Sequence, residues 1–191
     1  SELVKIAARS GANIIGLNPL NVLNHTYPED ASPYSSLSRL FMNPMYIDIE
    51  NVPEFIPSDR EDNLELIKEL RESELIRYTE VYNLKIKLLE EFYKRFKFGK
   101  DQKRHTDYQR FCEHKGVDLE KMALFQCLYD EKCAPEWCGG WRAWEKDYQD
   151  FNSETIKKYI KAHKDRIEFF KFMQFETERQ FDMAFQTAAE C

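Results

Sequence analysis

Apolar residues recur at helical spacing through most of the chain. The clearest case is the segment 76–98, which contains neither Gly nor Pro and places Val81, Leu84, Leu88 and Phe92 on one stripe. Intervals of three and four residues are typical of an amphipathic helix that buries one face. The pattern therefore predicts a long helix, whose apolar stripe is broad enough to face two neighbours.

Segments with similar spacing are separated by residues that favour helix ends. Ser58, Asp118 and Ser153 are suited to cap helix N-termini, and Gly99 and Gly116 are suited to end helices. We therefore expect an α-helical subdomain with an exposed loop in its middle. The subdomain covers residues 58–191, the loop covers 100–106, and the further predicted helices cover 59–70, a short stretch around 111–112, 119–131 and the Gly-free and Pro-free stretch 154–190.

The first 57 residues show a different pattern. An amphipathic stretch at the N-terminus and a turn at Ser10-Gly11 lead into the apolar run 13–17, which is typical of a buried parallel strand. A proline-punctuated segment, 51–58, then marks a linker. We therefore expect residues 1–57 to form a separate piece made of a helix, one strand and a long loop.

The loop that follows the predicted strand is rich in Ser, Tyr and Asn. Pro33 and Pro44 restrict the backbone around them to turn or extended geometry, so we expect a structured loop that ends in a short extended run at 45–49. In α/β folds, ligands bind beyond the carboxyl ends of the strands. Tyr34 offers an aromatic face and Ser32 a hydroxyl group, and both groups suit a sugar. The residues alone leave open whether the loop binds a sugar or whether its tyrosine only packs on the fold.

Several motifs occur together between residues 11 and 50. The chain reads Leu17-Asn18-Pro19-Leu20, then Ala31-Ser32-Pro33-Tyr34-Ser35, then Ser38-Arg39, and finally Asn43-Pro44 before Tyr46-Ile47-Asp48. In this combination the chain resembles the amylomaltase, or 4-α-glucanotransferase, family, and particularly its enterobacterial branch. A weaker resemblance continues through most of the chain.

The resemblance implies a fold, an activity and a set of binding residues. An amylomaltase is similar to a glycoside-hydrolase barrel with a large helical insertion. The implied fold is therefore mainly α, a helical insertion subdomain plus one strand-loop piece of a (β/α)8 barrel. The implied activity is the transfer of α-1,4-glucan segments between maltooligosaccharides, without a cofactor. Ser32 and Tyr34 are implied to contact the glucan, and Asn18 and Tyr27, on the same loop wall, are weaker candidates.

No catalytic residue is assigned to this chain. Retaining glycosyl transfer uses two carboxylates about 5 to 5.5 Å apart. The 34 Asp and Glu residues lie mostly at solvated helix positions, and none matches the family's nucleophile or acid/base motifs. We therefore expect the chain alone to be inactive. The alternative, from a different class, is a non-enzymatic helical interaction module whose Ser-Pro-Tyr loop is only structural.

Composition and cysteine usage limit the partners and the location. The net charge of −6 argues against a nucleic-acid or anionic-membrane surface, and no apolar run approaches the ~18 residues of a membrane span. The five cysteines lack the spacing of a disulfide framework, which favours free thiols and a cytoplasmic location. Cys133 and Cys138 have a spacing that can hold zinc, but no second close pair follows, so we expect no metal site.

The chain also has features of a piece of a larger protein. It opens without Met, and a complete barrel takes about 250 residues, more than the 191 present. A lone parallel strand leaves its backbone edges unpaired and its apolar faces uncovered. We therefore expect the first 57 residues either to be mobile or to pair with a second copy, which would give a concentration-dependent homodimer.

Overall fold

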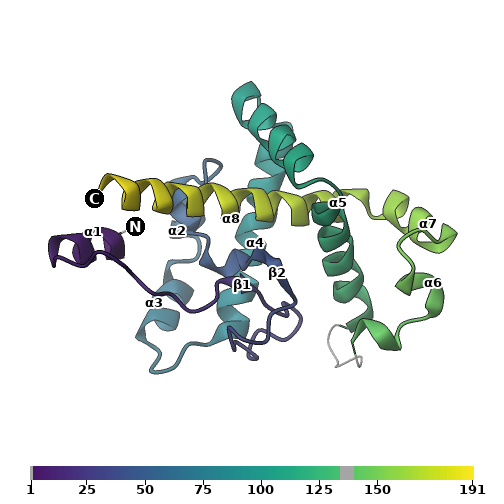
Figure 1. Cartoon of the computed structure of the whole chain (residues 1–191), viewed down its shortest axis with the longest axis horizontal. Coiled ribbons are helices and arrows are strands. Elements are labelled where there is room, and N and C mark those ends of the chain that lie inside the picture. Colours follow the sequence, from purple (N-terminus) through teal and green to yellow (C-terminus); the bar gives the residue numbers. More distant parts are fainter. Residues whose placement is uncertain (1, 134–139) are drawn as a thin grey trace. The chain divides into compact units, whose positions relative to one another are not determined.

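The structure is a computed structural model of the chain and describes residues 2–133 and 140–191. These residues are mainly helical, as expected, and their two short strands pair in one small sheet (Figure 1). The chain divides into two compact units, Ser1–Lys97 with Glu176–Cys191 and Phe98–Phe175. Helix α8 (Lys164–Glu190) therefore contributes residues to both units. The division expected near residue 57 stays a prediction.

In the first unit, the core lies along the helix predicted from the apolar stripe at 76–98. Leu89 and Phe92 on this helix have no exposed surface, and the Phe55 ring meets the Phe92 ring edge-on at a centroid distance of 6.3 Å. Burying side chains of this size stabilises the fold by about 1.5 to 3 kcal/mol each. The elements of this unit, besides the end of α8, are α1 (Glu2–Arg9), β1 (Asn21–Val22), β2 (Ser38–Met42), the 3-10 turns η1 (Pro44–Tyr46) and η2 (Ile49–Asn51), α2 (Pro57–Glu61), α3 (Leu64–Glu72) and α4 (Tyr78–Phe98).

The second unit holds a cluster of aromatic rings. Phe125, Tyr129 and Trp144 contact one another with centroid distances of 5.0 to 5.6 Å, and Trp144 is buried. Trp144 therefore serves the core of this unit. The elements of the unit, besides the start of α8, are α5 (Gln102–Cys133), the 3-10 turn η3 (Trp141–Ala143), α6 (Lys146–Gln149) and α7 (Glu154–Ala162).

Three predicted helix ends are confirmed. Helix α4 ends at Phe98, directly before Gly99. Gly116 interrupts α5 with φ 54° and ψ −138°, a left-handed backbone that glycine adopts at little cost. The Ser153 hydroxyl accepts a hydrogen bond from the Ile156 N–H at 3.1 Å and caps α7. Local chemistry was sufficient to place these ends.

Three other helix predictions were wrong in detail. The segment expected as a loop at 100–106 is helical from Gln102, because the Asp101 side chain accepts the Arg104 N–H at 3.0 Å and caps the helix. The stretch 154–190 is two helices, since His163 leaves helical geometry with ψ 23°. Helix α2 begins at Pro57 rather than after Ser58, because a proline suits the first turn.

The predicted parallel strand at 13–17 is wrong for this chain. The run has no strand pairing, and Ile14 is 88% exposed. A buried parallel strand requires neighbouring strands that accept its backbone hydrogen bonds, and the described residues offer none in parallel. The extended run expected at 45–49 is also wrong. It is replaced by two 3-10 turns, which the side chains of Asn43 and Asp48 cap by accepting backbone N–H groups.

A partly buried ion pair ties the start of α2 to α4. The Arg95 guanidinium donates two hydrogen bonds to the Asp59 carboxylate, at 2.6 and 2.7 Å, and a third to the Glu54 carbonyl at 3.0 Å. Asp59 also accepts the Ile56 N–H at 2.9 Å, which caps α2. The hydrogen bond from Arg95 is the main reason that the pKa of Asp59 lies below its usual value.

We expect Asp59→Asn to lower the free energy of unfolding of the 191-residue chain by about 2 kcal/mol near pH 7, since it leaves a partly buried guanidinium without its carboxylate. The depressed pKa of Asp59 means that its contribution is complete above the unfolded-state pKa of about 3.9 and is lost as the pH falls through the lower folded-state pKa. Urea unfolding at pH 7 and pH 3 measures both effects. Asp62→Asn, at an exposed position of the same segment, is the matched control. Equal stabilities of the two variants at pH 7 would contradict the assignment.

Candidate functional site

The candidate binding loop, residues 23–37, is closed at its base by the two short strands. Val22 in β1 pairs with Ser38 in β2, and the Leu37 N–H donates to the Val22 carbonyl at 2.9 Å. At the other end of the strand pair, away from the loop, the Asn43 N–H donates to the Leu20 carbonyl, also at 2.9 Å. The hairpin therefore holds both ends of the loop together while the loop itself extends from the fold.

Local hydrogen bonds shape the interior of the loop into consecutive turns. The Asn24 side chain accepts from both the backbone N–H and the hydroxyl of Thr26, at 3.1 and 2.9 Å. The Asp30 N–H donates to the Tyr27 carbonyl at 3.0 Å, and the Ser35 N–H donates to the Ser32 carbonyl at 3.1 Å. Pro33 occupies the second position of this last turn, where its fixed φ is suited.

The structure brings together two of the four predicted binding residues directly. The Tyr34 hydroxyl donates to the Asn18 side-chain oxygen at 3.2 Å, although the two residues are 16 positions apart. Ser32 starts the turn that contains Tyr34, and Tyr27 starts the preceding turn of the same loop. All four residues are exposed, and Tyr34 most clearly, at 74% of its surface. Their placement is compatible with a shared binding surface.

The exposed groups have the chemistry of a polar ligand site. Tyr34 presents a ring face with a hydroxyl group that Asn18 orients, and Ser32 adds a hydroxyl group that can both donate and accept. An aromatic face and a few fixed polar groups are common features of sites for sugars and other small polar ligands. No acid of this loop is placed beside Tyr34 or Ser32 by a hydrogen bond in the structure.

Sequence reasoning missed a residue that ties the loop to α4. The Glu29 carboxylate accepts hydrogen bonds from the Thr79 backbone N–H at 3.0 Å and from the Thr79 hydroxyl at 2.8 Å. The backbone hydrogen bond from Thr79 is the main reason that the pKa of Glu29 lies below its usual value. His25, which is buried, lies near the Tyr82 ring of α4, with centroids 6.4 Å apart. The residues are 50 positions apart or more, so no local pattern indicated these contacts.

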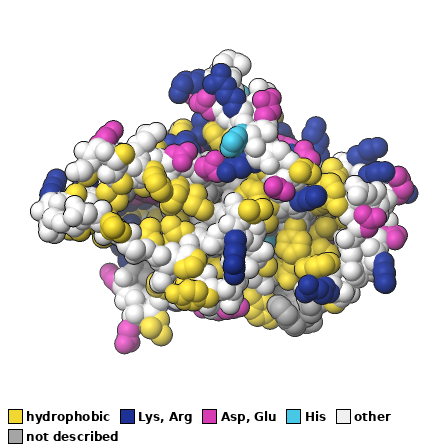
Figure 2. Space-filling model, viewed as in Figure 1, with side chains coloured by type: hydrophobic (Ala, Val, Ile, Leu, Met, Phe, Trp, Pro, Cys, Tyr) yellow, Lys and Arg dark blue, Asp and Glu magenta, His cyan; other side chains and the backbone are white. Residues whose placement is uncertain are grey.

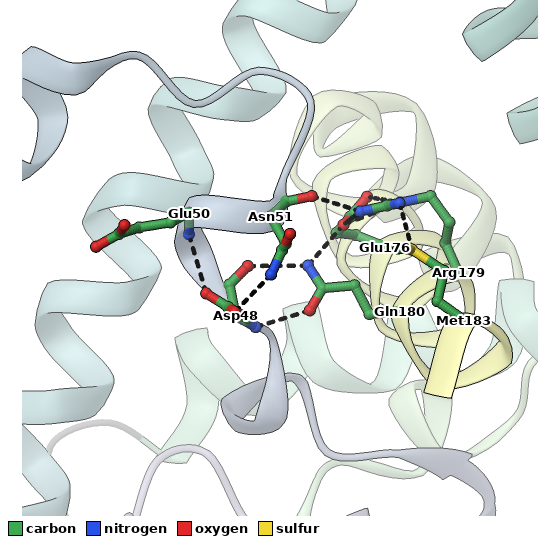
Figure 3. Close-up of polar contacts among 7 residues, drawn as sticks. All are labelled: Asp48, Glu50, Asn51, Glu176, Arg179, Gln180 and Met183. Atoms are coloured by element: carbon green, nitrogen blue, oxygen red, sulfur yellow. Dashed lines mark hydrogen bonds and ion pairs between the residues drawn. The ribbon is translucent and has the colours of Figure 1, made fainter. Parts of the chain in front are cut away.

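Beyond the hairpin, α8 satisfies the backbone of the segment that follows it. The Gln180 side chain accepts the Asp48 N–H at 2.8 Å and donates to the Asp48 carbonyl at 2.9 Å, in the manner of a neighbouring strand (Figure 3). Arg179 donates to the Asn51 carbonyl at 2.6 Å. The buried Glu176 carboxylate accepts from both Arg179 and Gln180 and fixes their direction.

Lys85 of α4 satisfies the same segment with an ammonium group. Its Nζ donates to the carbonyls of Met45 and Ile47, at 2.6 and 2.8 Å. Burial lowers the pKa of Lys85, and the negative charge of Asp48 opposes this effect. The segment 45–51, from which the hairpin and the candidate loop extend, is thus held by two helices of the first unit.

Among the described residues, no group of three or more His, Cys, Asp or Glu side chains could hold a metal ion. Cys138, one half of the pair considered for zinc, lies outside the described residues. Cys112, Cys127 and Cys191 are free thiols, but Cys133 is disulfide-bonded, so the expectation of free thiols is wrong at Cys133.

Within 2–133 and 140–191, no helix combines the length and apolar character that a membrane crossing requires.

Comparisons with known proteins agree with one another. The sequence model of the 4-alpha-glucanotransferase family matches residues 1–191. The 4-alpha-glucanotransferase of Haemophilus influenzae is 33% identical over 192 residues, which cover 93% of this chain and 28% of that protein. The 4-alpha-glucanotransferase of Clostridium butyricum is 30% identical over 147 residues, covering 76% of this chain and 28% of that protein.

A solved structure shows the same fold. The crystal structure of amylomaltase from Corynebacterium glutamicum superimposes with a TM-score of 0.74 at 24% identity, covering 98% of this chain and 25% of that chain. The chain thus spans less than a third of the length of the relatives that it matches.

We expect Lys85→Met to lower the free energy of unfolding by about 2 kcal/mol, because the carbonyls of Met45 and Ile47 would lose their donor. Lys87→Met, on an exposed position of the same helix, is the matched control and should change stability by less than about 0.5 kcal/mol. Thermal unfolding followed by circular dichroism measures both. If the two variants unfold alike, the ammonium group does not hold the segment.

Proposed function

This chain belongs to the 4-alpha-glucanotransferase family, and from that membership we propose that it is part of an enzyme that transfers α-1,4-glucan segments between maltooligosaccharides. The proposed architecture is a helical insertion subdomain joined to a strand-loop piece of a (β/α)8 barrel. The match over the whole chain is the observation that carries the proposal. The substrate class, an α-1,4-glucan, follows from the same membership.

We propose that this part of the protein binds the glucan and that the remainder of the protein holds the catalytic carboxylates. Retaining transfer needs a carboxylate nucleophile and a carboxylic acid about 5 to 5.5 Å apart, and an acceptor sugar then replaces water in the second step. We assign no catalytic residue to this chain. Its proposed contribution is one wall of the glucan site, formed by Ser32 and Tyr34 with Asn18 and Tyr27 beside them.

The exposure and anchoring of the candidate loop support this role. Tyr34 keeps its ring in solvent while its hydroxyl group bonds Asn18, and the hairpin below fixes the base of the loop. A loop already ordered before binding loses little conformational freedom when the ligand arrives. The ring face would pack on the C–H face of a glucose unit, and Ser32 would exchange hydrogen bonds with its hydroxyl groups.

We expect Tyr34→Ala to weaken maltoheptaose binding by the 191-residue chain about tenfold, the factor that corresponds to about 1.4 kcal/mol of lost ring contact. Isothermal titration calorimetry measures the dissociation constants. Tyr46→Ala removes another exposed tyrosine, outside the candidate loop, and should leave affinity unchanged. Absence of any binding by the unaltered chain would instead favour a helical interaction module without a sugar site.

We also expect the isolated chain to release no glucose from maltotriose above a buffer blank, because the proposed wall lacks both reacting carboxylates. A coupled glucose assay over several hours is the measurement, with a complete 4-alpha-glucanotransferase as the positive control. Glucose release proportional to the chain's concentration would show that the chemistry lies within these residues.

An apolar surface formed by both ends of the chain supports its being part of a larger body. Leu3, Ile14, Leu17 and Phe185 are exposed there, and a hollow of about 610 Å3 lies between α1, the run 11–20 and the end of α8. Figure 2 shows hydrophobic side chains gathered beside the C-terminal half of α8. Exposed apolar surface of this kind usually has a partner. We propose that the remainder of the enzyme covers it.

Without that cover, we expect the isolated chain to form a concentration-dependent homodimer through the same apolar surface. Sedimentation velocity across a hundredfold concentration range measures the equilibrium. Phe185→Asp, which places a charge on the surface, should shift the chain to monomer, while Phe98→Asp, at an exposed phenylalanine elsewhere, should not. Monomer at every concentration would contradict the expectation. A cytoplasmic location stays a prediction.

A further inference from the structure

The middle of the candidate loop is attached to α4 through one carboxylate. Glu29 lies three positions before Ser32, and its Oε1 atom accepts both the N–H and the hydroxyl group of Thr79, at 3.0 and 2.8 Å. Thr79 is in the first turn of α4, whose backbone N–H groups have no partner within the helix. The loop therefore supplies a cap that the helix would otherwise lack.

Charge makes this contact stronger than an ordinary surface hydrogen bond. An ionised carboxylate bonded to an N–H group is about twice as strong an acceptor as a neutral group, and the positive end of the helix dipole favours it further. Arg77, directly before α4, pairs with both Glu69 of α3 and Glu80 of α4. Glu29 thus attaches the loop to the start of a long helix.

The other contacts of the loop lie mainly at its two ends and in its first turns, away from the turn that contains Ser32 and Tyr34. The hairpin closes the loop at Val22 and Leu37, and the buried His25 anchors its first turns beside Tyr82. Tyr34 itself bonds Asn18. Apart from that bond, Glu29 is the residue of the loop closest in sequence to Ser32 and Tyr34 whose side chain is hydrogen-bonded to a helix or strand of the described structure. Release of Glu29 would free the turn that presents the proposed sugar-binding groups.

We propose that Glu29 is a positioning residue that docks the candidate loop on the first turn of α4 and thereby sets the placement of Ser32 and Tyr34 for the glucan. This role rests on the proposed glucan-binding function of the loop. Glu29 itself does not touch the sugar. Its effect is to remove the ordering cost that a free loop would impose on binding.

The test compares maltoheptaose binding, by calorimetry, for the 191-residue chain and five variants. Glu29→Ala should weaken binding about fivefold to tenfold, and Glu29→Gln, which keeps an acceptor oxygen but loses the charge, should weaken it by a smaller factor of about two to three. Thr79→Ala should have an intermediate effect. The double variant Glu29→Ala with Thr79→Ala should bind no more weakly than Glu29→Ala alone, because both changes remove one contact. Asp30→Ala, at the next exposed position, is the control.

A second measurement separates positioning from general stability. Hydrogen exchange of residues 27–35 should be faster in Glu29→Ala, while exchange at the centre of α4 stays unchanged. Equal affinities of Glu29→Ala and Asp30→Ala would overturn the positioning role and leave the glucan function intact. If the unaltered chain binds no maltoheptaose, the glucan function fails and this inference fails with it. Should Glu29→Ala unfold the chain, the comparison of Thr79→Ala with Asp30→Ala decides the same question.

Discussion

The backbone of residues 45–51 has no neighbouring strand, and side chains of two helices satisfy its polar groups. Gln180 bonds both the N–H and the carbonyl of Asp48, and Lys85 bonds two carbonyls just before it. The carbonyls bonded by Lys85 are part-buried, where a backbone group without a partner costs about as much as a lost hydrogen bond, while the Asp48 groups bonded by Gln180 are exposed. These side-chain contacts, together with the local hydrogen bonds of its two 3-10 turns, constrain the position of the segment relative to α4 and the end of α8.

The candidate loop depends on this constraint in turn, because it extends from the hairpin that directly precedes the segment. The hairpin sets the ends of the loop, and Glu29 and His25 attach its interior to α4. The same helix thus fixes both the base and the middle of the loop. A loop held at several points by rigid elements can present Tyr34 to solvent without losing its shape.

Local chemistry was enough to predict most of the helices but not the contacts between them. The stripe on α4, the break at Gly116 and the cap at Ser153 each follow from residues within a few positions, and all three are present. The pairing of Gln180 with Asp48 joins residues 132 positions apart, and no periodicity encodes it. For the site, the sequence motif around Ser32 and Tyr34 indicated which residues to consider. The hydrogen bond between Tyr34 and Asn18 could not be predicted from their positions in the sequence.

The predicted strand at 13–17 failed for a reason that bears on function. Its apolar pattern is that of a buried strand, yet a strand exists only where a neighbour accepts its hydrogen bonds, and here Ile14 lies in solvent. A helix, by contrast, pairs most of its backbone groups within itself and needs packing partners only for its apolar face and its ends. The two patterns therefore differ in what they require: a helix pairs its own backbone groups, while a strand at 13–17 would need a neighbouring strand that the described residues do not offer. In the proposed enzyme, the remainder of the protein would supply both the neighbours that a strand at 13–17 requires and the carboxylates that perform the transfer.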